Sequence, residues 1–182
     1  MKTMLIKCPG ASSLHKYNLP FSPACVILYP EKRKEVKTMS KAIFFDLDGT
    51  IANLYGVPNW LDRLRASDPA PYLEARPLVN LNVLARRLNT LQRKGYKIGI
   101  ISWLSKNSTS VYDAAVTQAK MKWLARHLRS VKWDNVYIVA YGTNKWNVCG
   151  EGILFDDEAK NREAWQEEAY EPTDIMTVLK AL

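Results

Sequence analysis

The chain has 182 residues, of which 47% are hydrophobic and 24% charged. This composition is typical of a folded protein with a sizeable core and excludes an intrinsically disordered one. No apolar run approaches the roughly 20 residues needed to cross a bilayer, and Lys7, Cys8 and Pro9 interrupt the apolar core of any signal peptide. The lack of such a run predicts no membrane partner, and three cysteines without CxxC spacing predict free thiols in a reducing, cytoplasmic setting.

The net charge of +8 is distributed unevenly along the chain. Residues 1–38 contain seven lysines and arginines against two glutamates, a net +5, which leaves +3 for residues 39–182. Most of the basicity therefore lies outside the segment that carries regular hydrophobic patterns. The overall charge is weak evidence for nucleic-acid binding.

Residues 1–38 show no sustained helical or strand periodicity, and we predict a basic N-terminal extension outside the folded domain. One interpretation is an arm that docks on a partner or on nucleic acid. We favour the interpretation that translation begins at Met39, because the codons of residues 34–36 can contain a bacterial ribosome-binding sequence and the next two codons supply a spacer. The extension would then be untranslated, or disordered where it is made.

From residue 41 onward, short apolar runs alternate with helical patterns. The apolar runs predict strands at 42–45, 96–102, 135–141 and 152–155. Helical spacing predicts helices from near residue 78 to just before Gly95, and at 108–130, 158–168 and 173–181, the last capped by Thr173. Strands that alternate with helices predict an α/β fold, a Rossmann-like parallel sheet with helices on both faces.

Fewer than about thirty residues lie between Thr50 and the first long predicted helix. They include a short predicted helix at 58–66. This length is too small for a large cap domain. We therefore predict one domain over 39–182 with a minimal cap, a small lid at about 51–77. The aromatic side chains of this lid are Tyr55, Trp60 and Tyr72.

Polar and charged side chains follow the carboxyl end of each predicted strand. They are Asp46 and Asp48, then Ser102, then Lys145 in the loop after the third strand, and finally Asp156 and Asp157. Because the carboxyl ends of parallel strands meet at one edge of a sheet, we expect these groups to gather there. Crowded carboxylates repel one another unless a hard cation neutralises them, and oxygen ligands suit Mg²⁺. Ser102 and Lys145 can hold phosphate oxygens, so the pattern predicts a site for a divalent cation and a phosphate.

These residues resemble a known set of motifs. The sequence DLDGT at 46–50, a hydroxyl after the second strand, a lysine and then FDD at 155–157 are similar to the four motifs of the haloacid dehalogenase (HAD) superfamily. The resemblance covers residues 41–182 and implies a HAD-like fold. It also implies a hydrolase that acts on phosphoric monoesters with Mg²⁺ as cofactor.

The resemblance assigns a role to each motif residue. Asp46 would be the nucleophile that forms an aspartyl-phosphate, and Asp48 the general acid/base. Lys145 would steady the nucleophile and the phosphate. The remaining roles implied are substrate binding by Gly49, Thr50 and Ser102, and Mg²⁺ binding by Asp46, the backbone carbonyl of Asp48, and Asp156, with Asp157 in support.

The presence of an aspartate at position 48 makes the first motif similar to that of the phosphatases of this superfamily rather than to that of its dehalogenases. The short span from Lys145 to Asp156 is similar to the 5′-nucleotidase branch, and the size of the chain resembles its small phage or bacterial members. The substrate implied is a nucleoside 5′-monophosphate or a similar small phosphate ester. A non-catalytic binding module of the same fold is an alternative, against which the intact motifs argue.

A polynucleotide 3′-phosphatase is a further alternative, because an open site suits a polymer. Lys120, Lys122 and Arg126 lie along one predicted helix and can form a face that contacts a nucleic-acid backbone. Lys120 and Lys122 also compete with Lys145 for the phosphate-site role. We favour a solvated helix surface for these side chains, since lysines within helices are usually exposed.

Several other residues have two interpretations. Asp157 can bind the metal or cap the following helix. Asn161 and Arg162 can orient the acidic loop or lie on the surface, and we favour the surface. Trp60, Trp103 and Trp146 can stack on a base, although we favour packing against neighbours. His127 is predicted to be structural, and Cys149 to have no chemical role.

Overall fold

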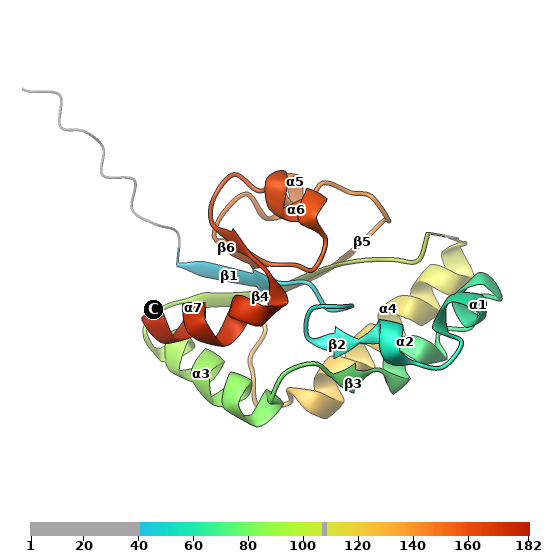
Figure 1. The fold of residues 1–182 in the computed structure, drawn as a ribbon, viewed down its shortest axis with the longest axis horizontal. Helices are drawn as coiled ribbons and strands as arrows, with labels where there is room; N and C mark the ends of the chain where they lie inside the picture. Colours follow the sequence, from blue (N-terminus) through green and yellow to red (C-terminus); the bar gives the residue numbers. More distant parts are fainter. Residues whose placement is uncertain (1–40, 107–108) are drawn as a thin grey trace, which may run out of the picture. The chain divides into compact units, whose positions relative to one another are not determined.

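The computed structural model describes residues 41–106 and 109–182. The extension predicted for residues 1–38 and the predicted helix start at Ser108 lie outside the described residues. A parallel five-stranded sheet with the order β5-β4-β1-β6-β7 forms the centre (Figure 1). Its strands are β1 (Ala42–Phe45), β4 (Lys97–Trp103), β5 (Asn135–Val139), β6 (Ile153–Phe155) and β7 (Ala169–Tyr170). The predicted Rossmann-like α/β fold is confirmed.

Helices cover both faces of the sheet. Successive residues of β1 point to opposite sides and all are buried, so both faces need a covering layer. Ile43 and Phe45 belong to a large core that includes side chains of α3 (Leu81–Arg93), α4 (Ser110–His127) and α7 (Ile175–Ala181). Phe44 faces a smaller core near α5 (Trp146–Cys149) and α6 (Ala159–Glu163). Figure 1 shows α5 and α6 on one side of the sheet and α3 and α7 on the other. None of the helices in the described part of the chain is long and apolar enough to cross a membrane.

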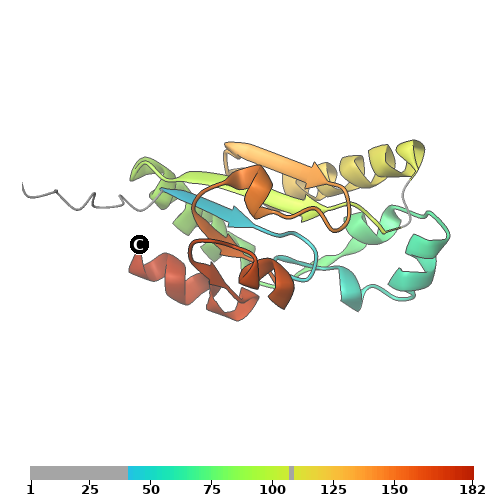
Figure 2. The same cartoon turned by 90° about the horizontal axis from the view of Figure 1, so that it is seen from above.

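The segment predicted as a lid contains five short elements. They are β2 (Ala52–Asn53), the 3-10 helix η1 (Leu54–Gly56), α1 (Trp60–Arg65), α2 (Ala70–Glu74) and β3 (Arg76–Pro77). β2 pairs antiparallel with β3. Tyr72 and Leu64 pack against Tyr112 and Val116 of α4, so the lid shares a hydrophobic core with this helix. Figure 2 shows the lid beyond the carboxyl ends of β1 and β4.

Two predicted helices near the C-terminus differ from the structure. The helix predicted at 158–168 ends at Glu163, because Trp165 packs into the smaller core and donates a hydrogen bond to the Gly152 carbonyl at 2.7 Å. The chain then forms β7 at the edge of the sheet. The last helix begins at Ile175, after the 3-10 helix η2 (Pro172–Asp174), so Thr173 does not cap it.

Candidate functional site

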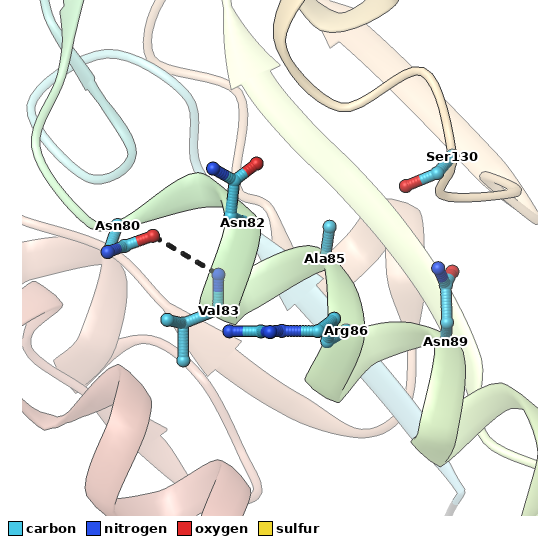
Figure 3. Close-up of a pocket in the computed structure, with 7 residues that line it drawn as sticks. All are labelled: Asn80, Asn82, Val83, Ala85, Arg86, Asn89 and Ser130. Atoms are coloured by element: carbon cyan, nitrogen blue, oxygen red, sulfur yellow. Dashed lines mark hydrogen bonds between the residues drawn. The ribbon is translucent and has the colours of Figure 1, made fainter.

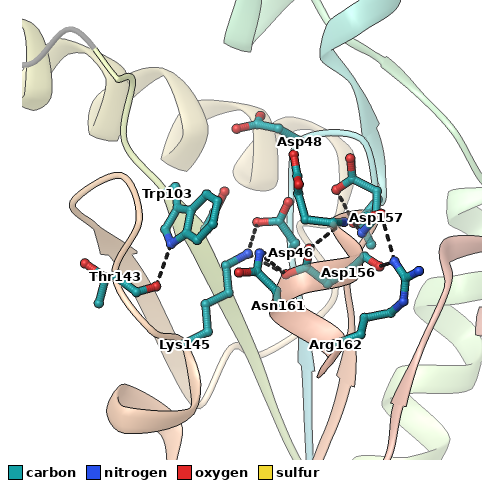
Figure 4. A network of polar contacts seen from close by, with 12 residues as sticks. Asp46, Asp48, Trp103, Thr143, Lys145, Asp156, Asp157, Asn161 and Arg162 are labelled. Carbon is teal, nitrogen blue, oxygen red and sulfur yellow. Dashed lines mark hydrogen bonds and ion pairs between the residues drawn. The ribbon is translucent and has the colours of Figure 1, made fainter. Parts of the chain in front are cut away.

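The polar side chains that follow the strands lie together at one edge of the sheet (Figure 4). β1 lies between β4 and β6, so Asp46 after β1 is flanked by Ser102 of β4 and Asp156 after β6. Lys145 immediately precedes α5 and reaches the same point. All four side chains are buried, with exposed fractions of 6% or less. The structure brings these predicted site residues together, whereas their chemical roles remain predictions.

Lys145 joins two of the carboxylates. Its Nζ donates to Asp46 Oδ1 at 2.8 Å and to Asp156 Oδ2 at 2.6 Å. Burial alone would lower the pKa of Lys145. The negative charges of Asp46 and Asp156 raise it by more than burial lowers it, so the net shift is upward and the ammonium stays charged. An ammonium has three N–H donors, and the third has no hydrogen-bond acceptor among the described residues. It is available to a phosphate oxygen.

Three carboxylates form a group suited to a metal ion. Asp46, Asp156 and Asp157 each offer one oxygen, and these oxygens all lie within 4.8 Å of one another. Burial, followed by the charges of Asp46 and Asp156, raises the pKa of Asp157 to about 7. The carboxylate of Asp48 is outside this group. Oxygen-only ligands favour a hard cation such as Mg²⁺ or Ca²⁺.

Asn161 and Arg162 hold the acidic loop from α6. Asn161 is buried, and its Nδ2 donates to both carboxylate oxygens of Asp156 at 3.1 Å. Arg162 Nη1 donates to the backbone carbonyls of Asp156 and Asp157, each at 2.8 Å. The surface interpretation of these two residues is therefore wrong. Their position one helical turn after the aspartates was the available signal.

Thr50 and Gly49 position Asp157. Thr50 Oγ1 accepts from the Asp157 backbone N–H at 3.1 Å and donates to Asp157 Oδ1 at 3.3 Å. Gly49 has φ +77°, and a Cβ there would lie 2.3 Å from Asp157 Oδ2, so only glycine fits. Asp157 does not cap α6, whose N-cap is Glu158. Substrate binding by Gly49 and Thr50 stays a prediction, since neither is among the described residues that line the cavity next to the site.

A second buried lysine completes the site. Lys120 of α4 is 0% exposed, and its Nζ donates to Asp48 Oδ2 at 2.5 Å, Ser102 Oγ at 2.9 Å and the Trp103 carbonyl at 2.5 Å. The prediction that Lys120 lies on a solvated surface is wrong, whereas Lys122 is exposed. The available signal was the position of Lys120 four residues after Val116 and four before Leu124, both of which are buried.

The charges of the inner site fit one divalent cation. Four aspartates face two lysines, which leaves a formal charge of −2 when all six groups are ionised. Burial, opposed by Lys120 and reinforced by Asp46, raises the pKa of Asp48. Burial and then Asp46 likewise raise the pKa of Asp156 despite Lys145. These upward shifts indicate that the lysines do not fully offset the burial of the carboxylates and the repulsion from Asp46.

A cavity of about 630 Å³ separates this cluster from the lid. Its volume lies within the range of small-molecule binding sites. The aromatic residues in its lining are Tyr55, Trp60, Tyr72, Trp103 and Tyr141. Trp60 and Trp103 therefore line the cavity, whereas Trp146 is not part of its lining.

The aromatic side chains form contacts on both sides of the cavity. The rings of Tyr55 and Trp60, in the lid, lie 5.0 Å apart, and those of Trp103 and Tyr141 lie 5.1 Å apart. Trp103 is fixed by a hydrogen bond from its Nε1 to the Thr143 carbonyl at 2.9 Å (Figure 4). Trp146, in contrast, packs against Trp165 in the smaller core, as the packing interpretation predicts.

A second hollow, of about 540 Å³, lies along α3 (Figure 3). Asn80 caps this helix by accepting a hydrogen bond from the Val83 backbone N–H at 3.2 Å. The described residues that line the hollow include no carboxylate, lysine or histidine. Among the described residues, this hollow therefore lacks the carboxylates and lysines that are gathered at the strand ends.

His127 and Cys149 lie outside the cluster at the strand ends, and burial shifts the pKa of each in the direction that favours its neutral form. The ring of His127 packs 4.6 Å from that of Trp123, and burial followed by the charge of Arg126 lowers its pKa. Burial raises the pKa of the Cys149 thiol to about 12, which keeps it protonated.

The fold and the site define a class: an α/β protein of Rossmann-like architecture with a buried acidic cluster at the carboxyl ends of its parallel strands. No protein-family model matches the chain, and no curated protein sequence matches it. Among solved structures, a chain of the "Structure of Pnkp1/Rnl/Hen1 complex" is similar at 19% identity, with a TM-score of 0.45. The match covers 74% of this chain and 46% of that one, so the present chain spans less than half the length of that relative.

Proposed function

We propose that the protein is a Mg²⁺-dependent phosphomonoesterase of HAD type that works through an aspartyl-phosphate. The observation that carries this proposal is the position of Asp46. Its carboxylate is buried, held by Lys145 at 2.8 Å, grouped with Asp156 and Asp157, and part of the cavity lining. A carboxylate oriented by a cation beside a metal-binding group is suited to attack a phosphorus atom.

Asp46, Asp156 and Asp157 would hold the Mg²⁺, together with the backbone carbonyl of Asp48. Bound there, Mg²⁺ would offset the excess negative charge of the site and polarise the phosphoryl oxygens. The formal charge of −2 on the four aspartates and two lysines supports a divalent ion at this point.

The reaction has two steps. A carboxylate oxygen of Asp46 attacks phosphorus, the bond from phosphorus to the ester oxygen breaks, and Asp48 gives a proton to the departing alcohol. Asp48 then takes a proton from a water molecule, which attacks the aspartyl-phosphate and releases inorganic phosphate and free Asp46. Ser102 and the third N–H of Lys145 bind phosphate oxygens in both steps.

The substrate we favour is a nucleoside 5′-monophosphate. A cavity of about 630 Å³ exceeds the needs of a phosphate group alone, and its aromatic walls suit a planar base. A polymer substrate has less support, because Lys120 is buried and only Lys122 and Arg126 remain exposed from the proposed backbone-contacting face.

The test is phosphate release with Mg²⁺ from nucleoside monophosphates, ribose 5-phosphate and 3′-phosphorylated oligonucleotides. We expect nucleoside 5′-monophosphates to be hydrolysed with the highest kcat/KM, with activity lost on chelation of Mg²⁺. A preference for the oligonucleotides would replace the substrate assignment, and a salt-dependent gel shift would check it. No turnover by protein that binds Mg²⁺ would favour the non-catalytic binding module.

A further inference from the structure

The Lys120 ammonium makes three hydrogen bonds inside the protein. Its acceptors are Asp48 Oδ2, Ser102 Oγ and the Trp103 carbonyl oxygen, at 2.5, 2.9 and 2.5 Å. Because an ammonium has three donors, none remains for a substrate. Lys145 differs in this respect, since it uses two of its donors on carboxylates.

We propose that Lys120 is a positioning residue that fixes the Asp48 carboxylate and the Ser102 hydroxyl in their reactive orientations. This inference rests on the proposed phosphatase function and assigns a role to a residue outside the strand-end motifs. Lys120 acts through its two partners and does not touch the phosphate.

The effect on Ser102 follows from the hydrogen-bonding capacity of a hydroxyl group, which has one donor hydrogen and an oxygen that accepts. Its oxygen accepts a hydrogen bond from Lys120, so its single hydrogen must point elsewhere. Ser102 lines the cavity, and none of the described residues accepts this hydrogen. Lys120 therefore turns the serine into a donor directed at an oxygen atom of a bound ligand.

The effect on Asp48 is similar. Lys120 holds Oδ2, and no described side chain donates a hydrogen bond to Oδ1. The Asp48 side chain is 14% exposed and lines the cavity, so the second oxygen is the one that can exchange a proton with a leaving group or a water. One ammonium thereby sets which oxygen of the carboxylate is reactive.

Lys120 also lies against the lid. Its Nζ is 4.9 Å from the centre of the Tyr72 ring, and α2 and α4 share a hydrophobic core. The ring covers the ammonium and helps to keep water from its hydrogen bonds, which strengthens them.

The experiment compares Lys120→Met, which keeps the length and removes the charge, with Lys122→Met on the exposed part of the same helix. kcat and KM are measured at saturating Mg²⁺ on the best substrate, and thermal unfolding is recorded for each variant. We expect Lys120→Met to lower kcat about 100-fold, with a smaller rise in KM because Ser102 also binds the phosphate in the proposed mechanism. Lys122→Met should behave as the wild type.

A double variant with Ser102→Ala tests whether Lys120 acts through the serine. We expect Lys120→Met with Ser102→Ala to lose no more activity than the worse single variant, because the residues work as a unit. Multiplicative losses would overturn that part. A kcat for Lys120→Met within about threefold of the wild type, or a loss confined to KM, would overturn the positioning role.

Lys120→Arg covers the case in which Lys120→Met does not fold. It keeps the charge, but a planar guanidinium cannot place one nitrogen among three acceptors. A lowered kcat in folded Lys120→Arg would support the proposal, and a wild-type kcat would overturn it. Absence of turnover in the wild type would overturn the phosphatase function itself, whereas an active wild type with an unaffected Lys120→Met overturns this inference alone.

Discussion

Two buried lysines hold the site, and they belong to different parts of the fold. Lys145 lies in the loop after β5 and connects Asp46 to Asp156. Lys120 lies inside α4 and connects Asp48 to Ser102. Each is 3% exposed or less, and each ammonium faces at least one carboxylate that offsets the cost of burying its charge.

The difference lies in the donors that remain free. Lys145 has one N–H left for a ligand, whereas Lys120 has none among its three. Substitution of Lys145 should therefore affect both KM and kcat directly, whereas substitution of Lys120, which acts only through Asp48 and Ser102, should lower kcat more than it raises KM. Separate measurements of KM and kcat can distinguish the two halves.

The largest expected effect is that of Asp46→Asn. The substitution keeps the size of the side chain and removes the proposed nucleophile, so kcat should fall by about 10⁴-fold or more. Lys145 retains Asp156 as a partner, and the fold should persist. Steady-state phosphate release measures the loss. Asp62→Asn, on an exposed residue of the lid, is the matched control, and substantial turnover by Asp46→Asn would exclude Asp46 as the nucleophile.

Lys145→Met should have the next largest effect. It leaves Asp46 and Asp156 as two buried carboxylates without their shared cation, so the free energy of unfolding should fall by about 3–5 kcal/mol without metal. Mg²⁺ should restore part of this stability. Urea unfolding with and without Mg²⁺ is the measurement.

Activity separates Lys145→Met from Lys120→Met. We expect Lys145→Met to raise KM and to lower kcat by about 100–1,000-fold, since its free donor stabilises charge on the phosphate. Lys122→Met is again the control. An unchanged KM for Lys145→Met would remove the distinction between the two lysines.

The sequence predicts the Lys145 half of the site because of topology. Residues that directly follow parallel strands converge whatever the details of packing, so Asp46 and Asp156 could be placed together without coordinates. Lys145 lies farther along the loop after β5, and its assignment to the site depends also on the motif resemblance. The Lys120 half depends on which face of a long helix turns inward. Lysine is usually exposed, and only the buried neighbours Val116 and Leu124 indicate otherwise.

The differences between the predicted and the observed elements near the C-terminus have a related cause. β7 has two residues, too few for any periodic pattern, and it forms because the chain after α6 pairs with β6. Asn161 and Arg162 are polar residues on a short helix, which usually means solvent. The burial of Asn161 and the contacts of Arg162 follow from the tertiary contact of α6 with the acidic loop, for which their spacing after the aspartates is the only local indication.

A smaller effect is expected for Asn161→Ala. Asn161 donates to both oxygens of Asp156 and so fixes the orientation of a proposed metal ligand. Loss of such an outer contact typically costs 10–100-fold in metal affinity, and we expect a Kd for Mg²⁺ raised by about that factor. Isothermal titration calorimetry measures it, with exposed Asn147→Ala as control. An unchanged Kd would show that Asp156 does not depend on Asn161 for its orientation, or is not a ligand.

The smallest expected effect is a pH dependence of stability that belongs to the acidic group. Asp157 has a pKa of about 7 in the folded protein against an ordinary value of 3.8. Between these values the folded protein holds a proton that the unfolded chain has lost. The free energy of unfolding of the metal-free protein should therefore decrease as the pH rises from about 4 to 7, by about 1–2 kcal/mol after screening by solvent.

Mg²⁺ should reverse this trend, because the cation takes the place of the proton above pH 7 and stabilises the folded protein most at alkaline pH. Lys145 does not obscure the effect. Its pKa is raised from 10.5, so its contribution to the free energy of unfolding changes only at pH values above 10.5. Urea unfolding at pH 5, 6, 7 and 8, with and without Mg²⁺, measures the slope. Asp157→Asn should reduce the slope, and what remains belongs to Asp48 and Asp156, whose pKa values are also raised. An unchanged slope would show that Asp157 does not hold the proton.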